Sequence, residues 1–211
     1  MVRRILLLFV SAIVIILFAT ASWLYRENDH KIDGVMQFAS LDAPAKVIRD
    51  EFGVPYVYAE SLDDAFRMQG FLIAQDRLLQ MEVVRHLSQG RLAELIGASG
   101  LSSDIQMRVV GVPELGRVIA KGLSPAARHT AELYLEGMNT YIESYSDEHQ
   151  LGLRVLGVKP NVWTVEELMI VNAFTNWSSS VNHEAELISQ AIIDKIGPEL
   201  ADQISIVSIN P

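Results

Sequence analysis

The sequence lacks cysteine and is poor in basic residues. The absence of cysteine among its 211 residues excludes disulfide bonds, thiolate metal sites and a cysteine nucleophile. There are 17 Lys and Arg residues against 26 Asp and Glu residues, which gives a net charge of −9. Nucleic-acid binding needs clustered Lys and Arg, so this balance argues against nucleic acid as a partner. Apolar residues make up 50% of the chain and charged residues 20%, which excludes both a disordered polymer and a polytopic membrane protein.

A long apolar run lies at the N-terminus. Arg3 and Arg4 precede the uncharged run 5–24. As a helix, this run would be about 30 Å long, which matches the hydrocarbon core of a bilayer. The leading arginines predict that the N-terminus stays in the cytoplasm and that the following chain is exported. We therefore expect residues 1–26 to form a single-pass anchor in the inner membrane, with the body on the periplasmic or extracytoplasmic side.

A cleaved signal peptide is the alternative interpretation of the same run. Ala19-Thr20-Ala21 forms an A-x-A site after an apolar core. The apolar core of a cleaved signal usually spans about 7–15 residues, and this run is longer, which favours the uncleaved anchor. Under both interpretations the rest of the chain is exported, as a polar tether at 27–41 and a body at 42–211.

The exported part predicts one β-hairpin followed by helices. Two short runs at 45–50 and 54–59 flank Gly53, which can supply the positive φ of a tight turn. Capping and stop signals predict helices at about 61–88, 124–145, 164–174 and 184–196, with a last one towards 206. A single hairpin is only marginally stable on its own and needs to join a further sheet. The predicted fold is therefore mostly α with a small β-hairpin, and incomplete on its own.

No complete catalytic signature is present in the sequence. The G-x-S-x-G, S-x-x-K, H-E-x-x-H and P-loop patterns are absent, and Gly97-Ala98-Ser99-Gly100 misses the nucleophile spacing. The five histidines are scattered, and none pairs with another at i+2, i+3 or i+4. The residues alone therefore indicate that this chain holds no complete active site, and we assign no catalytic residue.

Several motifs in the body are much more specific. They are VIRDEFGVPYVYA at 47–59, QGFLIAQDRLLQME at 69–82, GRLAELIG at 90–97, Asp104 and Arg108, EGMN at 136–139 and LGVKPNVW at 156–163. In this order they closely resemble the N-terminal (α) region of the penicillin acylase family, also called penicillin amidases, which are N-terminal nucleophile hydrolases. The resemblance covers 41–211. It implies that the chain is the α-chain portion of an αββα fold, preceded here by the expected transmembrane helix.

The resemblance implies an enzyme split between two chains. Family members are made as a precursor that cuts itself into α and β chains. A Ser becomes the first residue of the β chain and acts as nucleophile, with its own α-amino group as general base. The expected reaction is hydrolysis of a linear amide, in a substrate such as a penicillin, a cephalosporin or an N-acyl-homoserine lactone. The implied partners are the β chain and a small-molecule amide, and no Ser of this chain is assigned as nucleophile.

The resemblance also implies part of an acyl pocket at 169–187. Phe174, Asn176, Trp177 and Ser178 match the end of the pocket-lining helix. Without the resemblance, Phe174 and Trp177 would be interpreted as ordinary core aromatics. Penicillin-specific members carry Met, Arg and Phe where this chain has Phe174, Trp177 and Ser178, so the resemblance does not imply phenylacetyl specificity.

A calcium ion is the cofactor that the resemblance implies. Glu184 matches the glutamate that ligates calcium, an ion that prefers oxygen ligands. The match needs a one-residue gap between Ser178 and Glu184, so Glu186 stays open as the alternative ligand.

The polar residues of the AQDR motif have a structural interpretation. Gln75, Asp76 and Arg77 are consecutive on a predicted helix and cannot all face one ligand. We expect Asp76 and Arg77 to join buried ion pairs that lock this helix against its neighbours, and Arg49 to be structural as well.

The competing hypothesis for the whole chain is non-enzymatic: a truncated, inactive, membrane-anchored helical interaction module.

Overall fold

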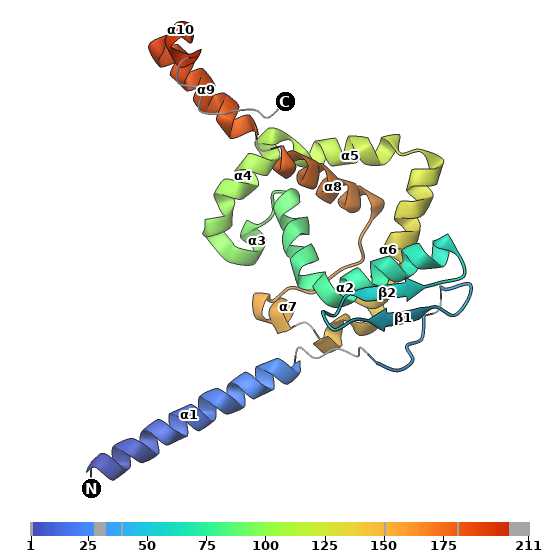
Figure 1. The fold of residues 1–211 in the computed structure, drawn as a ribbon, viewed down its shortest axis with the longest axis vertical. Helices are drawn as coiled ribbons and strands as arrows, with labels where there is room; N and C mark the ends of the chain where they lie inside the picture. Colours follow the sequence, from blue (N-terminus) through green and yellow to red (C-terminus); the bar gives the residue numbers. More distant parts are fainter. Residues whose placement is uncertain (1, 28–32, 39, 150, 181, 203–211) are drawn as a thin grey trace.

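The fold is that of a computed structural model, which describes residues 2–27, 33–38, 40–149, 151–180 and 182–202. Side chains are described for 9–22, 33–38, 40–145, 151–180 and 185–202. Within these ranges the chain is mostly helical and carries a single two-stranded sheet (Figure 1). The prediction of a mostly α fold with a small hairpin is confirmed.

The N-terminal helix α1 (Val2–Glu27) projects away from the helical body (Figure 1). Its described side chains are almost all exposed. In the described parts of the chain, no helix has the length and apolar character needed to cross a bilayer. The transmembrane helix expected from the sequence is therefore not found, and the predicted membrane anchor is not confirmed.

The hairpin consists of β1 (Lys46–Arg49) and β2 (Pro55–Tyr58), which pair in antiparallel fashion. Gly53 lies in the turn with a φ of +77°, as predicted, because residues with a Cβ rarely adopt this conformation. The Asp50 carboxylate closes the same turn by accepting two backbone N–H groups, at 2.9 Å each. The turn is thus fixed by its own residues.

Helices make up the rest of the described body. Three of them begin at the predicted caps: the side chains of Ser61, Ser124 and Thr164 each accept a backbone N–H from the first turn. The helices and the 3₁₀ turn η1 follow in the order α2 (Leu62–Ser88), α3 (Ala93–Ile96), η1 (Gly97–Gly100), α4 (Leu101–Val110), α5 (Val112–Gly122), α6 (Pro125–His149), α7 (Leu151–Leu156), α8 (Val165–Ser179), α9 (Asn182–Ile196) and α10 (Pro198–Ala201).

The main core lies where α2 packs against α6. Gly70 of α2 and Gly137 of α6 allow the two backbones to approach closely: a Cβ at Gly70 would lie 1.9 Å from the Tyr134 carbonyl oxygen, and one at Gly137 would lie 1.7 Å from that of Arg67. One face of α6 is buried. Its residues are Leu133, Leu135, Met138 and Ile142. Trp163, in the segment before α8, completes this core.

A second, smaller core joins α8 to α4 and α5. It consists of Met107, Val112 and Ala173, with Phe174 and Trp177 packed against it. Gly116 of α5 faces the backbone of α8, where an added Cβ would lie 2.4 Å from a backbone atom of Ile170. Sequence reasoning left α4 and α5 without a predicted helix, although both fix the position of α8.

One prediction about α2 is partly wrong. Asp76 does form an ion pair, with Arg49 of the hairpin at 2.8 Å. Arg77, in contrast, is exposed and donates to Gln80 Oε1 at 3.2 Å, so it does not join a buried ion pair. The cause is a local break in the helix, since Arg77 has a φ of −139° and a ψ of +19°.

Candidate functional site

The predicted acyl-pocket residues lie in the last turns of α8. Phe174 and Trp177 are half-buried, and their ring centroids are 6.3 Å apart. Asn176 and Ser178 are exposed, and their side chains donate to backbone carbonyls of their own helix at 2.9 Å and 3.1 Å. The structure thus brings the two aromatic side chains together and leaves the two polar ones on the exposed side of the helix. The pocket role of these four residues stays a prediction.

The predicted calcium ligand lies on α9. The side chain of Glu184 is outside the described residues, and its alternative Glu186 is exposed. In the part of the chain that the structure describes, no three His, Asp or Glu residues are grouped to hold a metal ion. Calcium takes six to eight oxygen ligands. The described residues therefore do not form a calcium site by themselves.

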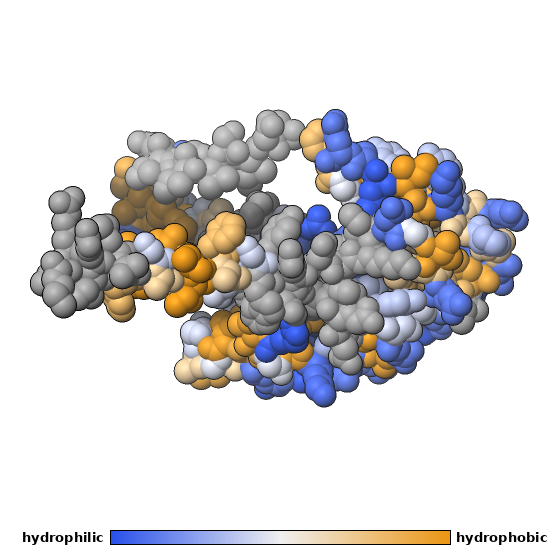
Figure 2. Space-filling model, turned by 90° about the horizontal axis from the view of Figure 1, so that it is seen from below, coloured by the Kyte–Doolittle hydropathy of each residue, from blue (hydrophilic) through white to orange (hydrophobic). Residues whose placement is uncertain are grey.

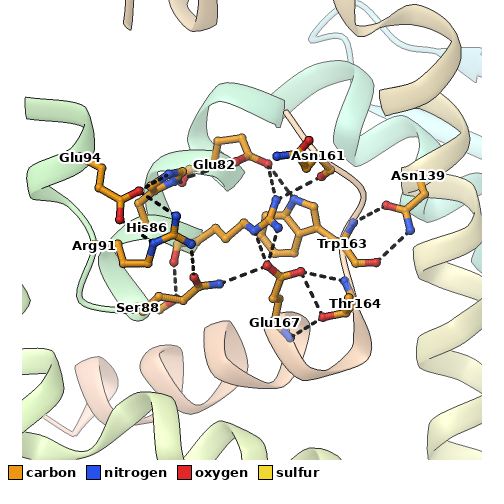
Figure 3. A network of polar contacts seen from close by, with 12 residues as sticks. Glu82, His86, Ser88, Arg91, Glu94, Asn139, Asn161, Trp163, Thr164 and Glu167 are labelled. Carbon is orange, nitrogen blue, oxygen red and sulfur yellow. Dashed lines mark hydrogen bonds and ion pairs between the residues drawn. The ribbon is translucent and has the colours of Figure 1, made fainter. Parts of the chain in front are cut away.

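Arg85 of α2 connects the helix that carries the predicted pocket to the main core. Its partners Asn161, Trp163 and Glu167 lie close together in Figure 3. Its Nε donates to Glu167 Oε1 in the first turn of α8 at 2.9 Å. Its Nη1 donates to the carbonyl oxygen of Asn161 at 3.1 Å. The guanidinium carbon lies 5.1 Å from the centroid of the Trp163 ring, within the range of a cation–π contact. Arg85 therefore fixes both the start of α8 and the segment that leads into it.

A buried carboxylate supports Arg85 from the same helix. Glu82 is only 2% exposed, and its Oε1 accepts from Trp163 Nε1 at 2.8 Å and from Arg85 Nη1 at 3.2 Å. His86 Nδ1 donates to the Glu82 carbonyl oxygen at 2.8 Å. A buried charge persists only when it is paired and hydrogen-bonded, as Glu82 is. These partners give the cluster a structural role.

Glu167 combines two functions at the start of α8. Burial raises the pKa of Glu167. The hydrogen bonds and the charge of Arg85, and the hydrogen bonds from the Thr164 backbone N–H and hydroxyl, lower it by more, so the pKa lies below its ordinary value. With Thr164 it forms a capping box, in which each side chain accepts the other residue's backbone N–H. Glu167 is therefore ionised at neutral pH, which suits a structural anchor and not a general acid.

Asp104 and Arg108, two motif residues of α4, hold the turn after α2. Asp104 is 6% exposed, and its carboxylate accepts the backbone N–H groups of Leu92 and Ala93 at 2.6 Å and 2.9 Å. Arg108 Nε donates to the Gly90 carbonyl oxygen at 3.0 Å. These contacts give both residues a structural role, so no ligand is needed to account for them.

A groove of about 1020 Å³ runs between the hairpin and α2. Its apolar lining includes Tyr56 of β2 and Phe66 and Ile73 of α2, and Asp76 and Arg77 add polar groups. None of the predicted pocket residues lines this groove. Sequence reasoning missed it, because it depends on how the hairpin lies against the helix.

Arg49 holds the hairpin against α2 beside this groove. Its two Nη atoms donate to both carboxylate oxygens of Asp76, at 2.9 Å and 2.8 Å. The same atoms also donate to Gln75 Oε1 at 2.8 Å and to the Gly53 carbonyl oxygen at 2.9 Å. A bidentate pair of this kind fixes orientation as well as distance. These contacts confirm the predicted structural role of Arg49 and the ion pair of Asp76, but Asp76 is exposed, so the pair is not buried as predicted.

Comparison with known proteins matches residues 44–208 to the penicillin amidase family. The chain is 31% identical over 181 residues to the acyl-homoserine lactone acylase QuiP of Pseudomonas aeruginosa, which covers 84% of this chain and 21% of that protein. It is 35% identical over 133 residues to the penicillin acylase 2 proenzyme of Pseudomonas sp. (strain SE83), with coverage of 63% and 17%. The chain thus spans about a fifth of the length of the curated relatives it matches.

A solved structure has the same arrangement of elements. A chain of the thermostable penicillin G acylase from Alcaligenes faecalis matches with a TM-score of 0.61 at 25% sequence identity. The match covers 80% of this chain and 93% of that chain. The two coverages show that the matched chain is short, and comparable in length to this one.

Proposed function

This chain belongs to the penicillin amidase family, and we propose that it is the α portion of an extracytoplasmic acylase that hydrolyses linear amides. The observation that carries the proposal is the match to the penicillin G acylase structure, which takes in nearly all of one short chain of that enzyme. The curated relatives are about five times as long as the matched region. The remainder of the catalyst is accordingly proposed to lie in a β chain.

The chemistry of this proposal belongs to the β chain. An N-terminal Ser attacks the amide carbonyl carbon while its own α-amino group takes the hydroxyl proton. The C–N bond breaks, the amine leaves with a proton, and the acyl group stays as an ester on the Ser. Water then hydrolyses the ester to the carboxylic acid. No residue of this chain is proposed to be catalytic.

The part proposed for this chain is to form one wall of the acyl pocket. Phe174 and Trp177 support this role, because they lie side by side at the end of a helix and are only half-buried. Asn176 and Ser178 would line the pocket mouth as polar groups. Substrates of the penicillin, cephalosporin or N-acyl-homoserine-lactone type are proposed, in line with the names of the relatives.

Calcium binding is a separate proposal that rests on the sequence match. Glu184, or Glu186 as the alternative, would supply one carboxylate ligand, with the other oxygen ligands coming from the β chain. The ion would have a structural role only.

Export and anchoring are proposed from the N-terminal sequence. Residues 1–26 carry two leading arginines and a run of uncharged residues, which supports an inner-membrane anchor with the body in the periplasm. Fractionation of cells that express the chain with and without residues 1–26 tests this. The anchored form is expected with the membranes, and recovery in the soluble fraction would contradict it.

The experiment that tests the proposed function compares the chain alone with the chain plus the β region encoded beyond the Pro211 codon. Hydrolysis of penicillin G and of an N-acyl-homoserine lactone is followed by release of the free amine. We expect activity only when both parts are present, and loss of activity when the first residue of the β chain is changed from Ser to Ala. If no β region is encoded and no amide is hydrolysed, the inactive interaction module is the better account.

A further inference from the structure

Helix α8 takes part in both hydrophobic cores. Val165 and Leu168, from its first turns, pack against the main core. Phe174 and Trp177, from its last turns, pack against the smaller core. A helix of this length is stiff, so the position of its first turn decides where the two aromatic side chains at its end lie.

The first turn of α8 has a polar anchor on α2. Glu167 Oε1 accepts from Nε and Nη2 of Arg85, and also from Gln89 Nε2 at 3.4 Å. The side chain of Arg85 is only 12% exposed. Figure 3 shows Glu82, Trp163 and Glu167 gathered close together at this anchor. An ion pair that is largely withdrawn from water and shares several hydrogen bonds fixes orientation as well as distance.

The anchor and the predicted pocket lie on the same face of α8. Glu167 and Phe174 are seven residues apart, which is almost two helical turns, so their side chains project in the same direction about 10 Å apart along the axis. Leu87 of α2 packs against the smaller core, to which Phe174 also contributes. The end of α2 therefore holds this face of α8 at two levels, through Arg85 and through Leu87.

The end of α8 is uncharged, which distinguishes it from much of the other exposed surface. Hydrophobic and hydrophilic residues lie side by side on the face that Figure 2 shows from below, so exposed apolar side chains do not by themselves mark a pocket. Charged residues make up 20% of the chain, yet none occurs at 168–183. Glu167 is the last charged residue before this run. A neutral wall suits an acyl chain, and its position depends on the contacts that hold α8.

We propose that Arg85 is a positioning residue for acyl selectivity: through Glu167 it sets the position of the pocket wall on α8, and with it the acyl length that the enzyme prefers. This inference rests on the proposed function, because it takes the end of α8 to contact the acyl group. In an apolar pocket, one methylene group changes kcat/KM by about tenfold or more. A small tilt of α8 is therefore enough to change which acyl chain fits.

Lysine cannot replace Arg85 in these contacts. The guanidinium serves Glu167, Glu82 and the Asn161 carbonyl oxygen at once. It also lies over the Trp163 ring. An ammonium group keeps the charge but loses the planar set of donors. Arg85→Lys therefore loosens the first turn of α8 while both carboxylates keep a cation beside them.

The test measures acyl selectivity in the assembled enzyme. Hydrolysis of a series of N-acyl-homoserine lactones of increasing acyl length gives kcat and KM for each substrate. We expect Arg85→Lys to reduce the preference for the best acyl length over its neighbours by about tenfold, mainly through a higher KM for the best substrate. Glu167→Gln keeps an acceptor for the helix cap but removes the charge, and it should flatten the preference in the same way.

Arg117→Lys is the matched control. Arg117 of α5 pairs with Glu166, the neighbour of Glu167 on α8, at 3.1 Å, and both side chains are exposed. Exposed pairs of this kind contribute little, so the acyl preference of Arg117→Lys should stay within about twofold of the parent. The ratio of kcat/KM for two substrates does not depend on the fraction of enzyme that is folded. A loss of stability alone therefore leaves this ratio unchanged.

The outcomes separate this inference from the proposed function. If the parent enzyme hydrolyses amides and both Arg85→Lys and Glu167→Gln keep its acyl preference, the positioning role is refuted and the proposed function stands. An equal change in Arg117→Lys would refute it as well. If Arg85→Lys gives no assembled enzyme, Glu167→Gln decides. If the parent enzyme hydrolyses none of the amides, both proposals fail.

Discussion

Asn139 and Trp163 hold each other through two hydrogen bonds. The Asn139 Nδ2 donates to the Trp163 carbonyl oxygen at 2.9 Å, and the Trp163 backbone N–H donates to Asn139 Oδ1 at 2.7 Å. The side-chain amide of Asn139 thus pairs with the backbone N–H and C=O of Trp163, as a residue of a neighbouring strand would. This contact fixes the segment between α7 and α8 on the surface of α6, and with it the starting position of the helix that carries the predicted pocket.

The first prediction concerns this amide. Asn139→Asp keeps the acceptor for the Trp163 N–H but replaces the donor by an oxygen that faces a carbonyl oxygen. We expect the free energy of unfolding to fall by about 1–3 kcal/mol, the cost of leaving a buried polar group unpaired. Asn172→Asp, at an exposed position of α8, is the control and should change it by less than about 0.5 kcal/mol. Urea denaturation measures both, and equal effects would refute the prediction.

The second prediction concerns the contact between Glu82 and Trp163. Glu82→Gln removes the charge that faces Arg85, and Trp163→Phe removes the indole N–H that Glu82 accepts. Because the two groups touch inside one network, their effects on stability should not add. We expect a coupling free energy of about 0.5–3 kcal/mol in a double-mutant cycle. Simple additivity would show that the charge of Glu82 does not strengthen its hydrogen bond with Trp163.

The third prediction concerns the close crossing of α2 and α6. Gly70→Ala and Gly137→Ala each place a methyl group inside contact distance of a backbone carbonyl, so the helices must move apart. Overpacking of this kind should destabilise the chain by about 1–3 kcal/mol or more. Gly122→Ala is the control, because a Cβ there meets no atom within 4 Å and its φ is not positive. Its effect should be neutral or slightly stabilising. The thermal unfolding midpoints of the three variants measure these effects, and equal midpoints would contradict the prediction.

The fourth prediction concerns acid stability. The pKa of Glu167 is lowered from its ordinary value of 4.5 in the folded state, so below that value the unfolded chain takes up a proton that the folded chain does not. Its contribution to stability is therefore complete above the ordinary pKa and is lost as the pH falls through the folded pKa. Glu167→Gln should lower stability at pH 7, and its difference from the parent should shrink in acid.

The control for acid stability lies on the same turn of α8. Glu166 is exposed and pairs with Arg117, which is exposed as well. Glu166→Gln should stay within about 0.5 kcal/mol of the parent at pH 7. A difference between the parent and Glu167→Gln that stays constant from pH 7 to pH 3 would contradict the prediction.

Much of the fold could be predicted from local signals. Ser61, Ser124 and Thr164 mark helix starts because their side chains satisfy N–H groups of the first turn, and this depends only on neighbouring residues. Gly53 marked the hairpin turn for a similar reason. Helix α5 escaped prediction, because its buried face is built partly from the small residues Gly116 and Ala120, which carry little apolar signal but let α8 come close.

The sites were less accessible to sequence reasoning. The charge of Asp76 indicated that it needs a partner. That this partner is Arg49 could not be predicted, because it depends on the hairpin folding back onto α2. The break in α2 at Arg77 has no sequence signal such as Pro or Gly, so its exposure could not be predicted. The groove has the same origin: its lining comes from two elements whose relative position is set by tertiary contacts alone.

The central claim is that this chain is one part of a split acylase. The most direct test is to purify the protein from cells that express the gene with its downstream sequence, and then to determine the polypeptides present by intact mass and N-terminal sequencing. The account predicts that this chain co-purifies in equal amount with a second polypeptide whose first residue is Ser. Amide hydrolysis by residues 27–211 alone, or active protein without such a second polypeptide, would contradict it.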